Sequence, residues 1–224
     1  MKSFITLLFS LLTLISFAQE SGKITYNITM ESDDPEMQQA MAMMGGDMEM
    51  QVISFYSEDG FRSEMTNPFM STTTISSSDS DEVLILMSGM MGKSAIKTAA
   101  SDYRDSKGLK GKKGESIDIT FKDETKEILG YTCKKAIIDA GSKEEMVFWY
   151  TEEIAPKKLA PDMPQSLPGI PLEYSMKTQG MDMNFVVTDI SFEPVDASMF
   201  NLDIPAGYKT MDLKALEKMG GMGF

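Results

Sequence analysis

The stretch that decides the fold is ILGYTCKKAIIDAGSKEEMVFWYTEEIAPKKLAPDMPQSLPGIPLEY, residues 128–174. It contains the only cysteine of the chain, Cys133, and the only tryptophan, Trp149. Side chains alternate in character over 131–139, and residues 145–151 are rich in β-branched and aromatic types, so both runs are predicted strands. Turn-forming residues lie between the two runs. The stretch therefore predicts a β-hairpin.

A proline-punctuated segment follows this hairpin, over residues 156–171. Proline fixes φ and cannot donate a backbone hydrogen bond to a neighbouring strand, so the segment is predicted to cross the fold as a rigid, irregular connection. Pro168 followed by Gly169 matches the two middle positions of a type II turn, because glycine accepts a positive φ. A further strand is expected from residue 171 onward.

Three motifs in this stretch resemble, in their order, the signature of the GLPGLI family, a group of exported bacterial proteins of unknown function. The motifs are Gly130-x-x-Cys133-x-Lys135-Ala136, Trp149-Tyr150-Thr151-x-x-Ile154 and Leu167-Pro168-Gly169-Ile170. The segment from Phe200 to Tyr208 is also similar, more weakly, to the lipoprotein carriers LolA and LolB. These resemblances imply an exported protein built as an open antiparallel half-barrel, and they imply no catalytic residues.

The N-terminus has the features of a secretory signal peptide over residues 1–18. Lys2 precedes an apolar run, and Ser16-Phe17-Ala18 matches a cleavage site with small residues. We expect cleavage after Ala18 and a mature, single β-rich domain over 19–224 that is periplasmic or secreted. The apolar run is too short for a membrane span and no second one follows, so none is predicted.

Composition narrows the function classes. The formal net charge is −13, and removing Lys2 with the leader makes it −14, which argues against nucleic acid as a partner. The chain has no histidine, so imidazole-dependent catalysis and the usual metal-hydroxide sites lose their main residue. Cys133 is expected to be a buried small hydrophobic residue. Residues 101–115 predict a flexible basic loop, and 220–224 a frayed tail.

The remaining pattern predicts strand after strand with short turns. The most apolar mature run, 82–87, is predicted to be a central strand. Asp34 and Pro35 predict the start of a short helix, and Thr210 is expected to cap a second one near the C-terminus. The predicted fold class is therefore mainly β: a single curled antiparallel sheet, an open LolA-like half-barrel, with a short helix in the N-terminal region and a short C-terminal helix.

Methionine is the unusual component, with 22 residues that gather in short clusters. Methionine suits surfaces that adapt to apolar ligands, so we expect a non-enzymatic binder or carrier of an apolar or lipid-like molecule, with no protein partner indicated. The predicted ligand-binding residues are Met37, Met41, Met44, Met48, Trp149 and Tyr150. The alternative is a Cu(I) site formed by the thioethers of Met41, Met43 and Met44, and no other cofactor is predicted. A methionine-rich core and a carboxylate-based enzyme stay open as further alternatives.

Overall fold

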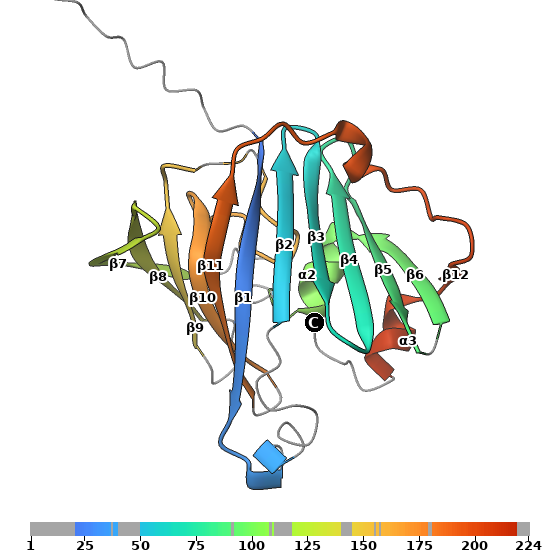
Figure 1. The fold of residues 1–224 in the computed structure, drawn as a ribbon, viewed down its shortest axis with the longest axis horizontal. Coiled ribbons are helices and arrows are strands. Elements are labelled where there is room, and N and C mark those ends of the chain that lie inside the picture. Colours follow the sequence, from blue (N-terminus) through green and yellow to red (C-terminus); the bar gives the residue numbers. More distant parts are fainter. Residues whose placement is uncertain are drawn as a thin grey trace, which may run out of the picture.

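The computed structural model describes residues 21–36, 38–39, 50–90, 92–107, 109, 118–139, 145–154, 156, 158–178 and 181–218. These residues form one sheet of twelve strands (Figure 1). The strands are β1 (Gly22–Ser32), β2 (Met50–Ser57), β3 (Gly60–Thr66), β4 (Met70–Ser77), β5 (Glu82–Gly89), β6 (Gly92–Ala99), β7 (Ile119–Ile128), β8 (Tyr131–Asp139), β9 (Glu145–Thr151), β10 (Ile170–Thr178), β11 (Met181–Ser191) and β12 (Lys209–Thr210).

The strand order places β1 between two meanders. Strands β2 to β6 follow one another on one side of β1, and β11 back to β7 follow on the other. All neighbours are antiparallel except β12, which pairs with β6 in parallel. The mainly β fold class and the single antiparallel sheet predicted from the sequence are therefore confirmed.

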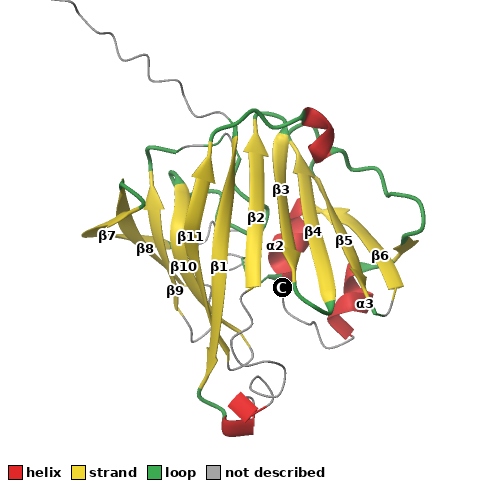
Figure 2. Ribbon diagram, viewed as in Figure 1, coloured by secondary structure: helices red, strands yellow, loops and turns green. Residues whose placement is uncertain are grey.

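Short helices accompany the sheet (Figure 2). The N-terminal helix begins at Pro35, where the Glu36 N–H donates to Asp34 Oδ1 (2.8 Å), as the capping pattern predicts. The others are α2 (Ala100–Ser106), α3 (Leu213–Lys218) and the 3-10 turn η2 (Ala197–Phe200). None of the described helices has the length and apolar content that crossing a membrane requires.

Two helix predictions differ from the structure in detail. The range 101–115, expected to be a loop, begins with α2, because Tyr103 is buried and anchors this turn against the sheet. The cap of α3 is Asp212, whose Oδ1 accepts from the Lys214 N–H (2.9 Å), whereas Thr210 pairs in β12. The predicted signal peptide (1–18) and the predicted frayed tail (220–224) lie outside the described residues.

The sheet has two faces of different character. We call the face that packs against α2 and α3 the helix face, and the opposite one the open face. In β1, Ile24, Tyr26 and Ile28 are buried in the main core on the helix face. Their neighbours Thr25 and Asn27 point the other way and stay partly accessible. Figure 1 is viewed from the open face, with α2 behind the sheet.

The proline-rich segment fills the helix face with the chain's own side chains. Leu159, Met163 and Leu167 are buried in the same core cluster as the strand residues. The Tyr26 hydroxyl donates to the carbonyl oxygen of Pro171 (2.8 Å) and fixes the end of the segment. The segment is thus a core layer, not only a connection.

Gly169 has a different role from the one predicted. It is not among the residues with positive φ, so the type II turn is not formed. A Cβ at this position would lie 1.9 Å from the Thr151 carbonyl oxygen. Glycine is therefore needed here because two backbone segments approach each other closely.

Strand β5 lies third from one end of the sheet and is not central. It is apolar because both of its faces are covered. Val83 and Ile85 pack with Tyr103 on the helix face. Leu84 packs with Phe200 on the open face, beneath residues 195–208, which we call the C-terminal strap. The apolar side chains of the strap cover the open face over β4 to β6.

Candidate functional site

The structure describes two of the sequence-predicted site residues, Trp149 and Tyr150, and does not bring these two together. Met37, Met41, Met43, Met44 and Met48 lie outside the described residues. Trp149 and Tyr150 are consecutive on β9, so they point to opposite faces. Tyr150 is buried on the helix face, where its ring meets Phe121 edge to face at 6.0 Å. Trp149 is half-buried on the open face.

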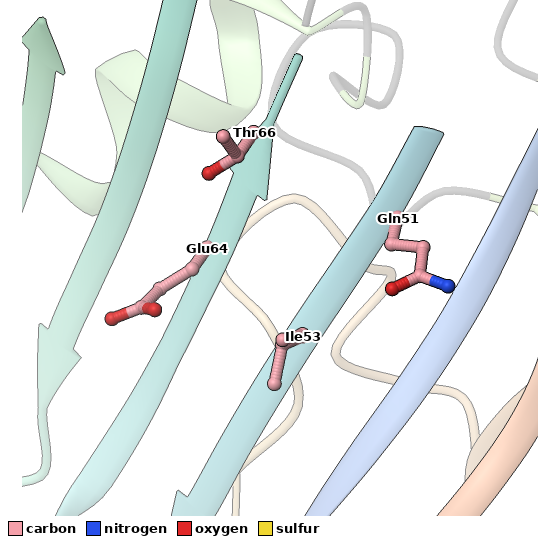
Figure 3. A pocket seen from close by; sticks show the side chains of 4 residues that line it. All are labelled: Gln51, Ile53, Glu64 and Thr66. Carbon is pink, nitrogen blue, oxygen red and sulfur yellow. The ribbon is translucent and has the colours of Figure 1, made fainter. Parts of the chain in front are cut away.

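A pocket on the open face lies between β2 and β3. It has a volume of about 380 Å³ and is lined by Gln51, Ile53, Glu64 and Thr66 (Figure 3). Gln51 pairs with Thr66 and Ile53 with Glu64 across the two strands, which brings the four side chains to the same face. The pocket therefore combines an amide, a carboxylate, a hydroxyl and one aliphatic group.

Hydrogen bonds hold the polar rim of this pocket in place. The Gln51 side-chain amide donates to Asn27 Oδ1 on β1 (3.2 Å). The hydroxyls of Thr66 and Ser71 lie 3.3 Å apart. Amides and hydroxyls both donate and accept, so each of these groups keeps capacity for a further polar partner.

The carboxylate of Glu64 is oriented by Arg62. Arg62 Nε donates to Glu64 Oε1 at 2.6 Å, and Nη2 lies at the same distance from that oxygen. Arg62 Nη1 also donates to the Met199 carbonyl oxygen in the C-terminal strap (3.3 Å). The strap therefore helps to position Glu64 through Arg62. The charges of Arg62 and Glu64 balance each other.

Trp149 forms a second polar and aromatic cluster on the same face. Lys126 Nζ lies 4.5 Å from the centre of the indole, and Lys135 Nζ lies 5.6 Å from it. Lys126 pairs with Glu173 (2.5 Å) and Lys135 with Glu124 (3.0 Å). These contacts combine cation–π attraction with ion pairing and fix the orientation of the ring.

The helix face carries titratable groups of a different kind. Burial raises the pKa of the Asp162 carboxyl above its usual range, and the nearby Lys107 opposes that shift. Burial lowers the pKa of Lys107, whose Nζ lies 5.6 Å from the centre of the Tyr103 ring. Burial also raises the pKa of the Tyr103 hydroxyl, with the Asp162 charge acting in the same direction. This cluster joins α2 to the proline-rich segment, so we interpret it as a structural contact.

Two further groups bear on the chemistry. Burial raises the pKa of the Cys133 thiol to about 11, so the thiol stays protonated at neutral pH and lacks nucleophilic character. Within the described ranges, no group of three or more His, Cys, Asp or Glu side chains is placed to hold a metal ion.

Sequence reasoning missed the pocket residues. Gln51 and Ile53 share one face of a predicted strand, which is visible in the alternation, but Glu64 and Thr66 join them only through the β2–β3 register. An amide, a carboxylate and a hydroxyl at outward strand positions were the available signal. No spacing along the sequence distinguishes such residues from ordinary solvated ones.

The comparisons with known proteins point to one family. The family model described as N-glycanase peptide, N-terminal domain matches residues 24–213. Two crystal forms of PNGF-II share 18% sequence identity with this chain at a TM-score of 0.50. They cover 89% and 90% of this chain and 33% and 32% of their own, so this chain spans about a third of their length.

A more distant structural neighbour is a LolA superfamily protein from Nitrosomonas europaea. It shares 8% identity at a TM-score of 0.37 and covers 83% of this chain and 91% of its own. Among curated proteins, no sequence matches this chain.

These findings correct two sequence-based predictions. The family match over 24–213 replaces the GLPGLI resemblance, which rested on short Gly, Pro and Trp motifs that mark turns and hairpins in many antiparallel sheets. The match to the N-glycanase family also overturns the lipid-carrier function and its Cu(I) alternative. On the helix face, the proline-rich segment occupies space that a ligand in that interpretation would need.

Proposed function

The chain belongs to the N-glycanase peptide N-terminal domain family, and from this we propose that it binds the carbohydrate of glycoproteins without cleaving it. The description of the family names an N-glycanase, an enzyme that acts on N-linked glycans. This chain spans only about a third of the PNGF-II structures. We propose that this domain recognises the glycan.

The open-face pocket is the observation that carries the proposal. A sugar presents hydroxyls, which need donors and acceptors close together, and C–H faces, which need apolar surface. Gln51, Glu64 and Thr66 supply the polar groups, and Ile53 supplies the aliphatic surface between them. A volume of about 380 Å³ lies within the range of small-ligand pockets.

A non-catalytic role fits the same residues. Hydrolysis of a glycosidic bond commonly uses two carboxyl groups placed on either side of the bond. Among the residues that line the described pocket, Glu64 is the one acidic side chain, and Arg62 holds it. We also propose that the domain acts in an exported compartment, where glycoprotein surfaces are accessible, because the sequence predicts a signal peptide over residues 1–18.

Calorimetric titration with a glycopeptide tests this proposal. The full chain is titrated with a peptide that carries one neutral N-glycan and, separately, with the same peptide without the glycan. We expect binding only to the glycosylated form. Gln51→Ala and Glu64→Gln should each weaken it about tenfold, because each alters a polar group that would contact a sugar hydroxyl in the pocket.

The matched control is Glu127→Gln, which makes the same chemical change on the exposed edge strand β7. This variant should bind as the unchanged chain does. Thermal unfolding of every variant verifies that the fold is retained. Equal binding to the two peptides would refute the proposed function.

A further inference from the structure

We infer that the open face binds an extended, uncharged oligosaccharide that runs across the strands from the pocket to Trp149. This inference rests on the proposed function and names its ligand more narrowly. It assigns a second contact, at Trp149, that lies outside the pocket lining.

The strand register places the pocket and Trp149 on one row. Each member of the row is the direct cross-strand partner of the next, so the row runs perpendicular to the strands. The row is Thr66, Gln51, Asn27, Val186, Glu173 and Trp149. It crosses β3, β2, β1, β11, β10 and β9 in that order. With a strand separation of about 4.8 Å, five steps give a length of about 24 Å.

The row offers the chemistry that a chain of sugars requires. Its amides, Gln51 and Asn27, already hydrogen-bond each other and retain further donors and acceptors. Val186, which is 37% exposed, and the accessible part of the half-buried Trp149 indole, beside Lys126 and Lys135, provide apolar surface for sugar C–H faces. Apolar and polar side chains thus follow one another along the row, and no described helix or strap covers it.

Charge on this face favours an uncharged ligand. Four ion pairs lie on or beside the row, each with one cation and one anion. They are Arg62–Glu64, Lys126–Glu173, Lys135–Glu124 and Lys23–Asp189. The lysine and arginine side chains that could attract an acidic glycan are already paired with carboxylates. These carboxylates would also repel the acidic groups of the glycan. A neutral glycan meets no such repulsion.

Trp149 reports directly on the far end of the row, because it is the only tryptophan of the chain. Its intrinsic fluorescence therefore reports on the surroundings of this one side chain. Lys126 and Lys135 keep the ring oriented, so an approaching ligand meets a preformed contact.

The test uses three versions of one glycopeptide: a complete neutral oligomannose glycan, a single N-acetylglucosamine, and an acidic glycan with terminal sialic acids. Affinity and Trp149 emission are recorded for each with the full chain. We expect the complete neutral glycan to bind at least tenfold more tightly than the single sugar and to shift the emission. The single sugar should bind at the pocket and leave the emission unchanged.

Variants separate the two ends of the row. Trp149→Ala should lower the affinity for the complete neutral glycan about tenfold and leave that for the single sugar unchanged. Trp149→Phe, which keeps an aromatic ring, should recover part of the loss, and Val186→Glu should act like Trp149→Ala. Tyr150→Phe is the matched control, because it alters the next residue on the other face.

The outcomes distinguish the inference from the proposed function. If the complete glycan and the single sugar bind equally without an emission change, the row is refuted and the pocket proposal stands. Tighter binding of the sialylated glycan refutes the assignment of a neutral ligand. If no glycosylated form binds better than the bare peptide, both proposals fail.

Discussion

The two faces of the central strands differ although they are built from alternating residues of the same segments. On β1, Tyr26 donates a hydrogen bond into the core, whereas the adjacent Asn27 bonds with Gln51 on the open face. The helix face is apolar and filled, and the open face carries amides, hydroxyls and paired charges. The difference teaches that the stability of this sheet and its proposed glycan recognition depend on side chains that are one residue apart and can be changed separately.

The largest expected effect tests the helix face. Phe148 is fully buried and stacks on Tyr174, with ring centres 5.6 Å apart and planes 12° from parallel. We expect Phe148→Ala to lower the free energy of unfolding by about 3–5 kcal/mol, measured by urea denaturation, because it leaves a cavity. Val186→Ala, on the open face, should cost about 0.5 kcal/mol or less. Similar losses in the two variants would break the contrast between the faces.

The next effect tests the close approach at Gly169. Its missing Cβ would lie 1.9 Å from the Thr151 carbonyl oxygen, and that neighbour is backbone. We expect Gly169→Ala to destabilise the fold by about 3 kcal/mol in the same assay, because the proline-rich segment must move away. Ser166→Ala, at an exposed position of that segment, serves as the control. An unchanged Gly169→Ala protein would show that the segment is loosely held.

Alkaline pH should weaken the core through Cys133. Its pKa is raised to about 11 from an ordinary value of 9, so the folded state holds the thiol proton more tightly than the unfolded state. The stabilisation is complete below pH 9 and is lost as the pH rises to 11, by about 2 kcal/mol. When the free energy of unfolding is measured from pH 8 to 11, we expect Cys133→Ala to lack the loss of stability that the thiol causes in the unchanged chain. Parallel curves for the two proteins would contradict the prediction.

A smaller effect tests the hydrogen bond of Tyr26. Tyr26→Phe removes the donor to the Pro171 carbonyl oxygen and keeps the ring. We expect a loss of about 1 kcal/mol in the free energy of unfolding, because a buried acceptor loses its partner. Tyr208→Phe, a half-buried tyrosine on the strap, is the control and should cost less.

The smallest expected effect on stability concerns the open face and completes the comparison of the two faces. Gln51 is exposed on the open face, so Gln51→Ala should change the free energy of unfolding by about 0.5 kcal/mol or less. The same variant is expected to lose about tenfold in glycopeptide affinity. A large loss of stability would show that the pocket side chains also support the fold.

Much of the fold was predictable from local patterns. The alternation in β1 and β8 and the capping by Asp34 each depend on neighbouring residues. The position of β5 in the strand order was not predictable. An apolar run indicates that both faces of a strand are buried, but it does not indicate where the strand lies in the sheet. Coverage by the strap and α2 depends on distant segments.

The candidate site was less predictable for the same physical reason. Trp149 and Tyr150 stand together in the sequence, but a strand sends neighbours to opposite faces, and only Trp149 reaches the open one. Gln51 and Glu64 meet only through the pairing of β2 with β3. Such pairing is set by tertiary packing, so motif spacing gives no direct access to it.

The place of β1 also governs how the chain can fold. It is the first described strand of the chain, yet its pairing partner on one side is β11, with Lys23 opposite Ser191. The meander β2–β6 can form from local contacts, whereas β1 cannot be enclosed until β11 has been synthesised. Contacts between such distant segments slow folding, because a long loop must be closed before they form. The centre of the sheet is therefore the last part to close, and a chain that ends before residue 181 leaves β1 as an open edge.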